Sequence, residues 1–123
     1  MTGRRAEGER HEDSAADYLL SLGYTLIARR FRAAGGEIDL VALDDETLVF
    51  VEVKYRTKQP PEAAIDHTKV ARISQAADAY LAKTGAHQKR CRFDVIAVFP
   101  GGLRHHIGAF HAPRPVLRPP DDD

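Results

Sequence analysis

Two charged residues interrupt a strongly apolar segment of the 123-residue chain, "LVFVEVKYR" at residues 48–56. Its Leu, Val, Phe and Tyr residues are typical of a pleated, half-buried β-strand. Glu52 and Lys54 fall inside this strand, where a charge is costly unless it is paired or bound to a metal ion. The position of these two residues therefore suggests a chemical role.

A further acidic position lies in the preceding segment, "GEIDLVAL" at residues 36–43. Because side chains alternate between the two faces of a strand, Asp39 is expected to share a face with Glu37. The opposite face takes the apolar residues Ile38, Leu40 and Ala42. For Glu37 we favour an ion pair with a nearby arginine over a role in the site.

The short "DDET" connection predicts a hairpin, which makes Asp39 and Glu52 cross-strand neighbours. Opposite residues in such a pair have Cβ atoms about 5 Å apart, so the two carboxylates repel and raise each other's pKa. Mg²⁺ relieves this repulsion, because it prefers oxygen ligands and is often held by one or two carboxylates. The Val53 carbonyl can add a third oxygen. Spacing alone leaves open a solvated sheet face with a Glu52–Lys54 pair.

Two more residues are candidates for the same site. Lys54 follows Glu52 by one pleat on the same face, where a lysine can hydrogen-bond a water nucleophile or the scissile phosphate. Glu12 precedes Ala15 by three residues and Leu19 by seven, so it borders the apolar stripe of the first predicted helix. We expect Glu12 to lean over the sheet toward the metal, with an exposed helix acid as the alternative.

Basic residues form two groups that are candidates for contact with a nucleic-acid backbone. Arg29, Arg30 and Arg32 precede the Gly35–Gly36 turn. The second group consists of residues at the end of the Glu52 strand and at the start of the second predicted helix: Arg56, Lys69 and Arg72. For both groups, ordinary solvated surface charge is the alternative.

The order of predicted elements is one helix, three strands, a second helix and two strands. The middle is a meander and the end is a crossover through a helix, which favours an α/β fold with a mixed sheet flanked by helices. We expect one domain over residues 1–112. Residues 113–123 are Pro-rich with an acidic end and are expected to form an irregular tail.

Composition narrows the class of protein. The chain has 18 basic and 18 acidic residues, so the net charge exerts no overall pull toward nucleic acid or membrane. The single Cys91 excludes an internal disulfide and indicates a reducing compartment. No apolar run approaches the roughly 20 residues of a membrane span. The sequence therefore predicts a soluble cytoplasmic protein without a membrane partner.

The motifs also carry a resemblance to a known family. The helix pattern "ExxAxxYL" from Glu12, the segments "GEIDL" and "FVEVK", Lys69, and "RFDV" at residues 92–95 resemble the uncharacterised bacterial YraN-like family. That family is placed in the PD-(D/E)XK nuclease superfamily and is similar to archaeal Holliday junction resolvases. The superfamily's proline before the aspartate is Ile38 here, and Arg30 stands where the family often has Asn.

The resemblance implies a restriction-endonuclease-like αβββαβ core and phosphodiester hydrolysis that depends on Mg²⁺ or Mn²⁺. By motif position, Asp39 and Glu52 would be metal ligands, Lys54 the catalytic lysine and Glu12 the extra helix acid. We therefore predict a Mg²⁺-dependent DNA endonuclease, acting on branched or otherwise structured DNA.

Two other functions and an assembly state remain open. A catalytically silent nucleic-acid-binding module with a nuclease-like core is the alternative, and a protein-interaction domain is a third reading. The last predicted strand, "LRHHIGAF", resembles an edge strand, and resolvases of the similar family are dimers. We therefore predict a weak homodimer.

Overall fold

The computed structural model describes residues 3–57, 65–86 and 89–111. The predicted tail, residues 113–123, lies outside the described residues, so the division into domain and tail stays a prediction. Within the described ranges the elements follow the predicted order. They are α1 (Gly3–Ser21), β1 (Thr25–Ala33), β2 (Gly36–Asp44), β3 (Thr47–Tyr55), α2 (His67–Thr84), β4 (Arg90–Phe99) and β5 (Gly102–Phe110).

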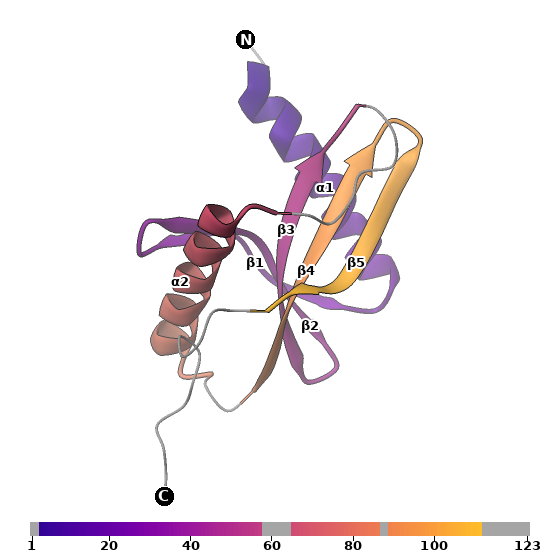
Figure 1. Ribbon diagram of the computed structural model, residues 1–123. Helices are drawn as coiled ribbons and strands as arrows, with labels where there is room; N and C mark the ends of the chain where they lie inside the picture. The colour runs from indigo at the N-terminus through magenta and orange to yellow at the C-terminus, as the bar shows by residue number, and fades with distance from the viewer. Residues whose placement is uncertain (1–2, 58–64, 87–88, 112–123) are drawn as a thin grey trace, which may run out of the picture.

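The five strands form one sheet in sequence order, β1-β2-β3-β4-β5, with a helix on each face (Figure 1). Strands β3 and β4 are parallel, and the other neighbouring pairs are antiparallel. The parallel pair requires a crossover, which α2 provides. This confirms the predicted mixed sheet. Neither described helix carries an apolar run of the length and hydropathy that a membrane span requires.

The side chains of β3 alternate between two hydrophobic cores, one on each face of the sheet. Val49 and Val51 pack with Leu19 and other residues of α1 on one face of the sheet. Leu48 and Phe50 pack on the other face with the buried side of α2. Glu52, two residues after Phe50, is thereby placed on the α2 face at the end of an apolar row.

Helix α1 is longer than its apolar pattern indicated. The pattern predicted a helix from Glu12, but α1 begins at Gly3. The added turns include Glu7, Glu9 and Arg10, which are good helix formers and lie largely in solvent. Since these turns bury little surface, they leave no apolar period for a sequence pattern to detect.

Helix α2 has a well-defined start. Asp66 is its N-cap and accepts a hydrogen bond from the backbone N–H of Lys69 at 2.8 Å. Gly85 ends the helix with φ 73°, a left-handed conformation suited to glycine. The N-cap fixes the first turn of α2, and with it the direction in which Lys69 leaves the helix.

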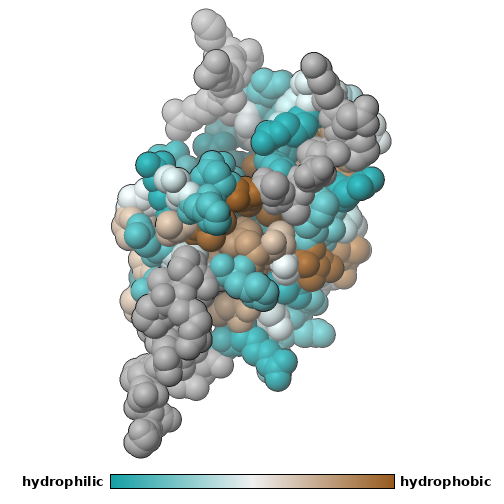
Figure 2. Space-filling model, in the orientation of Figure 1, coloured by the Kyte–Doolittle hydropathy of each residue, from teal (hydrophilic) through white to brown (hydrophobic). Residues whose placement is uncertain are grey.

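Strand β5 is an edge of the sheet, as the sequence predicted. Ile107 on this strand is 61% exposed. The coloured part of the face in Figure 2 is mixed, with hydrophobic residues across the middle of the view and hydrophilic residues around them. An exposed apolar residue on an edge is compatible with strand pairing, and the weak homodimer stays a prediction.

A buried polar network holds β4 and β5 to the α1 face. Asp94 is fully buried and accepts hydrogen bonds from Arg92 Nε at 2.9 Å and from the Gly108 N–H at 3.0 Å. His105 Nε2 lies 2.7 Å from Asp94 Oδ2, and His105 Nδ1 lies 3.2 Å from the Tyr18 hydroxyl of α1. Burial alone would raise the pKa of Asp94, but the bonds from His105, Arg92 and Gly108 outweigh it and hold that pKa below its usual value.

We predict that Asp94→Asn lowers the free energy of unfolding by about 3 kcal/mol at neutral pH, because it leaves Arg92 without its buried partner. The carboxylate stabilises the fold above about pH 4, its pKa in the unfolded chain, and this contribution is lost as the pH falls through the lower folded-state pKa. Urea unfolding of both proteins at several pH values measures this. The difference should shrink below about pH 4.

Asp17→Asn on the exposed side of α1 is the matched control, with an expected change within about 0.5 kcal/mol. An Asp94→Asn protein as stable as this control would show that the network contributes no net stability.

Candidate functional site

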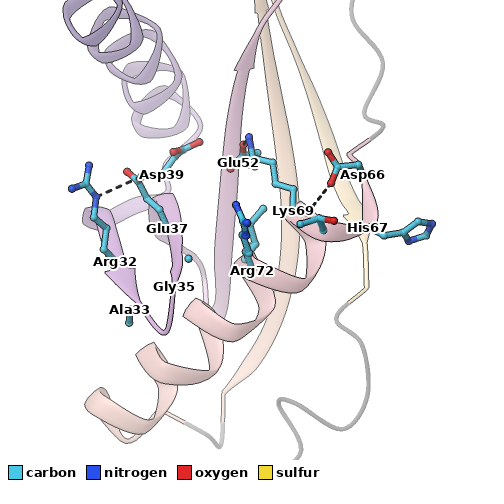
Figure 3. Close-up of a pocket in the computed structure, with 13 residues that line it drawn as sticks. Arg32, Ala33, Gly35, Glu37, Asp39, Glu52, Asp66, His67, Lys69 and Arg72 are labelled. Carbon is cyan, nitrogen blue, oxygen red and sulfur yellow. Dashed lines mark hydrogen bonds and ion pairs between the residues drawn. The ribbon is translucent and has the colours of Figure 1, made fainter.

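An open cavity of about 1110 Å³ lies on the α2 side of the sheet (Figure 3). It is lined by the end of β1 and the turn that follows, by inward residues of β2 and β3, and by the first turns of α2. The lining residues include the acids Glu37, Asp39 and Glu52 and the cations Arg32, Lys69 and Arg72. The structure thus brings together both predicted metal-binding carboxylates and three of the predicted phosphate contacts.

Asp39 lies where β2 separates from β3. The last paired residues on this side are Leu40 and Val51, so the same register would set Asp39 opposite Glu52. Beyond this point the Asp39 side chain, and not the main chain of β2, accepts the hydrogen bond from β3. Its Oδ2 accepts from the Val53 N–H at 2.7 Å. In a strand, the N–H and C=O of one residue point the same way, so the Val53 carbonyl faces the same gap.

The predicted alternation of β2 is wrong for Ile38. Leu40 and Ala42 pack in the α1-side core, but Ile38 packs in the α2-side core together with Val41. Ile38 is still paired with Phe31 of β1, but it lies beyond the end of the ladder with β3 at Leu40, so β2 is held there on one side only.

Glu52 has a direct cationic partner. The side chain of Glu52 is 6% exposed, and its Oε2 lies 2.6 Å from Lys69 Nζ. Lys69 reaches it from the first turn of α2 while its own side chain stays 53% exposed. An almost fully buried carboxylate is thus neutralised by an ammonium group that remains in contact with solvent.

Glu52 and burial together disfavour the charged form of Asp39. Burial, and after it the charge of the neighbouring Glu52 carboxylate, raise the pKa of Asp39 to about 8. The hydrogen bond from Val53 opposes this rise, and the charge of Glu12 adds to it. Near neutral pH without another cation, the arrangement therefore favours a proton on Asp39.

A close backbone approach sets the width of the cavity. A Cβ added to Gly36 would lie 2.2 Å from the Arg72 carbonyl oxygen of α2. Glycine is required here because it lets β2 and α2 touch through their main chains. This contact fixes α2, which carries Lys69, relative to β2, which carries Asp39.

Arg32 of β1 and Glu37 of β2 lie on the rim of the cavity across from α2 and form an ion pair at 3.5 Å. The sequence-based preference for Glu37 as the partner of a local arginine is thus confirmed. Arg32 remains 64% exposed, so solvent weakens this pair and leaves the guanidinium accessible from the cavity.

Lys54 occupies a different position from Lys69. It is half-buried on β3, opposite Ala97 of β4 in the parallel ladder, and it is absent from the described residues that line the cavity. Arg56 follows at the exposed end of the strand, where its side chain donates to the Tyr55 carbonyl. For both residues the predicted roles stay predictions.

Glu12 is buried and held by β1. Arg30 Nε donates to Glu12 Oε1 at 2.8 Å, and Arg29 pairs with Asp13 at 2.7 Å. Consecutive strand residues normally point to opposite faces, but Arg30 has φ 55°, and both arginines reach α1. Arg29 and Arg30 are thus engaged by acids of the same chain.

The donor set at the carboxylate pair fits a hard divalent cation. Asp39, Glu52 and the Val53 carbonyl offer oxygen atoms alone, the ligands that Mg²⁺ and Mn²⁺ accept. Within residues 3–57, 65–86 and 89–111, no three His, Cys, Asp or Glu side chains gather closely enough to hold a metal by themselves. Two carboxylates, with water and phosphate oxygens completing the shell, are a common arrangement for Mg²⁺.

Sequence reasoning missed the contact between Lys69 and Glu52. It assigned Lys69 only to nucleic-acid contact. Lys69 precedes the buried Ile73 by four residues, so it continues the inward stripe of α2. The sequence signal was limited to the position of this lysine at the start of an inward stripe, which does not identify its acidic partner.

The fold has a counterpart among solved structures. The Holliday junction resolvase Hjc of Archaeoglobus fulgidus, an archaeal hyperthermophile, superposes with a TM-score of 0.53, covering 80% of this chain and 75% of that one. The sequences are 21% identical, so this similarity concerns the fold alone. It confirms the resolvase-like α/β architecture.

Sequence relatives extend over nearly the whole chain. A UPF0102 protein of Symbiobacterium thermophilum is 44% identical over 116 residues, which cover 88% of this chain and 98% of that protein. A UPF0102 protein of Persephonella marina is 39% identical over 107 residues, covering 85% and 92%. The model of the uncharacterised protein family UPF0102 matches residues 11–98, from just before Glu12 almost to the end of β4. The chain therefore belongs to the uncharacterised protein family UPF0102.

Proposed function

We propose that this protein is a Mg²⁺-dependent endonuclease that hydrolyses phosphodiester bonds in branched or otherwise structured DNA. The observation that carries the proposal is the pair formed by the half-buried Asp39 and the buried Glu52, set beside the Val53 main chain in an open cavity with cationic walls. The resolvase fold supports it, because Hjc is a Holliday junction resolvase.

Each residue of the site has a distinct proposed task. Asp39, Glu52 and the Val53 carbonyl would hold Mg²⁺ or Mn²⁺. When bound, such an ion supplies a Lewis acid that polarises the scissile phosphate and helps to ionise the attacking water. Lys54, next along β3 on the face of Glu52, orients that water or offsets the charge that develops on the phosphate. Glu12 is not one of these metal ligands, and its negative charge acts on the neighbouring Asp39.

The cavity walls indicate how the nucleic-acid strand would be held. Arg32 on one rim and Arg72 on the other face the same space, in which the carboxylates lie (Figure 3). Cations on both sides offset the repulsion between a phosphate and the two acids, and phosphate contacts position a strand without reading its sequence. A net charge of zero makes this local segregation of charge the main source of affinity.

The second candidate function is a nucleic-acid-binding module without catalysis. The ion pair between Lys69 and Glu52 favours it, because it neutralises one carboxylate without a metal. The two functions differ in one respect, since only the nuclease requires both carboxylates to be ionised and shared by a metal.

We predict that Asp39→Asn stabilises the metal-free protein. The folded-state pKa of Asp39, about 8, lies above that of an unfolded Asp, so ionisation opposes folding increasingly as the pH rises from about 4 to 8. The asparagine avoids this penalty and still accepts the Val53 N–H. We expect about 2 kcal/mol higher stability near pH 8 in EDTA, and little difference near pH 4.

The same variant should lose the rise in melting temperature that Mn²⁺ gives the wild type, because a ligand that binds only the folded state stabilises by mass action. Thermal melts with and without Mn²⁺ measure both effects, with Asp17→Asn as the matched control. An undiminished Mn²⁺ shift in Asp39→Asn would refute its role as a ligand.

We predict that the purified protein cleaves at least one of linear, nicked, flapped or four-way DNA in Mg²⁺ or Mn²⁺, and that Glu52→Gln does not. Glutamine keeps the size of the side chain but removes a charged ligand, so the rate should fall by at least about a hundredfold. Gel assays of end-labelled DNA measure the rate. Glu46→Gln, in the exposed β2–β3 turn, should cleave like the wild type.

Two outcomes would oppose the nuclease. DNA binding by the wild type without cleavage of any substrate would favour the silent module. Equal cleavage by Glu52→Gln and the wild type would place the chemistry elsewhere.

We predict that Glu12→Gln folds but cleaves about 10–100-fold more slowly, as substitutions beside a metal site commonly do. Asp13→Asn is the control, because this neighbouring acid also pairs with an arginine of β1 but is exposed. Circular dichroism establishes folding, and single-turnover cleavage gives the rate. Full activity in Glu12→Gln would make its ion pair with Arg30 purely structural.

A further inference from the structure

The contact between Lys69 and Glu52 is asymmetric. Glu52 is almost completely buried, whereas more than half of the Lys69 side chain is exposed. A buried carboxylate needs a partner, because an unpaired charge in this position is strongly unfavourable. A lysine with a solvated stem can leave at little cost, because its flexible side chain regains rotamer freedom and its ammonium is readily hydrated. The acid thus depends on the contact more than the lysine does.

The place of the ammonium is also the place that a metal would need. Lys69 Nζ lies 2.6 Å from an oxygen of Glu52, a distance that excludes a second cation from the same side of that oxygen. A divalent ion that takes Glu52 as a ligand must therefore compete with Lys69 for this carboxylate.

The cavity extends from Glu52 along the first turns of α2. Lys69 leaves the first turn of α2, whose residues His67 and Thr68 also line the cavity. Arg72, one turn further along α2, faces the same space, and no ion pair joins it to a described residue. An ammonium released from Glu52 would lie near Arg72, in the space where a bound phosphate would contact that guanidinium.

We propose that Lys69 is the resident counterion of Glu52, that a divalent cation displaces it, and that the displaced ammonium then pairs with a backbone phosphate of the bound strand. This inference rests on the proposed metal-dependent function. It assigns Lys69 a role in ordering events, since the strand gains this phosphate contact only after the metal has bound. In the absence of metal, the same lysine keeps the buried Glu52 neutralised.

The first test measures metal affinity without any reaction. Mn²⁺ binding to the nucleic-acid-free protein is followed by isothermal titration calorimetry for the wild type, Lys69→Met and Lys69→Arg. Removing the competing cation should make Mn²⁺ bind about tenfold more tightly in Lys69→Met, whereas Lys69→Arg should stay near the wild type. Lys69→Gln, which keeps a hydrogen-bond donor for Glu52, serves as the uncharged variant if the methionine variant does not fold.

Arg72→Met is the matched control. It removes one positive charge from the same cavity without removing a partner of Glu52. Its effect on Mn²⁺ affinity therefore measures only the long-range repulsion between a cavity cation and Mn²⁺. The inference requires a larger gain in Lys69→Met than in Arg72→Met. Equal gains, or no gain in Lys69→Met, would overturn it. Absence of Mn²⁺ binding in the wild type would instead overturn the proposed function.

The second test measures the phosphate contact. The slope of log Kd against log salt concentration counts phosphate contacts, at about 0.9 for each. Binding to four-way DNA is measured in EDTA and in Ca²⁺, for the wild type and Lys69→Met. The two proteins should have equal slopes in EDTA, and in Ca²⁺ the wild type should be steeper by about one contact. Equal slopes in Ca²⁺ would show that Lys69 never reaches the phosphate.

Discussion

The carboxylates of the half-buried Asp39 and the buried Glu52 lie side by side, and the rest of the site depends on how the repulsion between them is offset. Burial and the charge of Glu52 together oppose ionisation of Asp39. The protein offsets this with one cation on Glu52, from Lys69, and one main-chain hydrogen bond on Asp39, from Val53. Such a pair is a liability to folding alone, which is the physical reason to regard it as a binding site.

The scaffold keeps the pair together through three rigid contacts. The ladder between β2 and β3 ends at Leu40 and Val51. Asp39 and Glu52 are the next residues along each strand, so this last pair keeps them close together. Gly36 docks the start of β2 against the backbone of α2. The Asp66 cap sets the first turn of that helix. Because each contact involves main-chain atoms, the positions of the acids and of Lys69 depend little on side-chain packing at the cavity.

The sequence predicted the parts of the fold that regular periodicity governs. The alternation in β3 located Glu52 correctly because that strand is paired with β2 up to Val51 and with β4 through Tyr55, so its register cannot slip. The same rule failed for Ile38, which lies beyond the end of the ladder with β3 and is paired with β1 alone. It also gave no sign that Arg29 and Arg30 both turn toward α1, because this depends on the left-handed backbone of one residue.

Long-range polar contacts were beyond the reach of sequence patterns for a different reason. Lys69 and Glu52 are 17 positions apart, and Asp94 meets Tyr18 through His105 only after three elements have packed. Periodicity reports burial of apolar faces, and it carries no information on which buried acid meets which base. The motif resemblance supplied Asp39, Glu52 and Lys54 as a set, while the structure adds Lys69 to the acids.

A crystal structure with Mn²⁺, read through its anomalous signal, shows whether Asp39 and Glu52 share a divalent cation. We expect one Mn²⁺ bound by oxygens of Asp39, Glu52 and Val53 at about 2.0–2.6 Å, with Lys69 moved away from Glu52. Crystals soaked at saturating Mn²⁺ that show no anomalous peak at this pair, with Lys69 still on Glu52, would contradict this expectation.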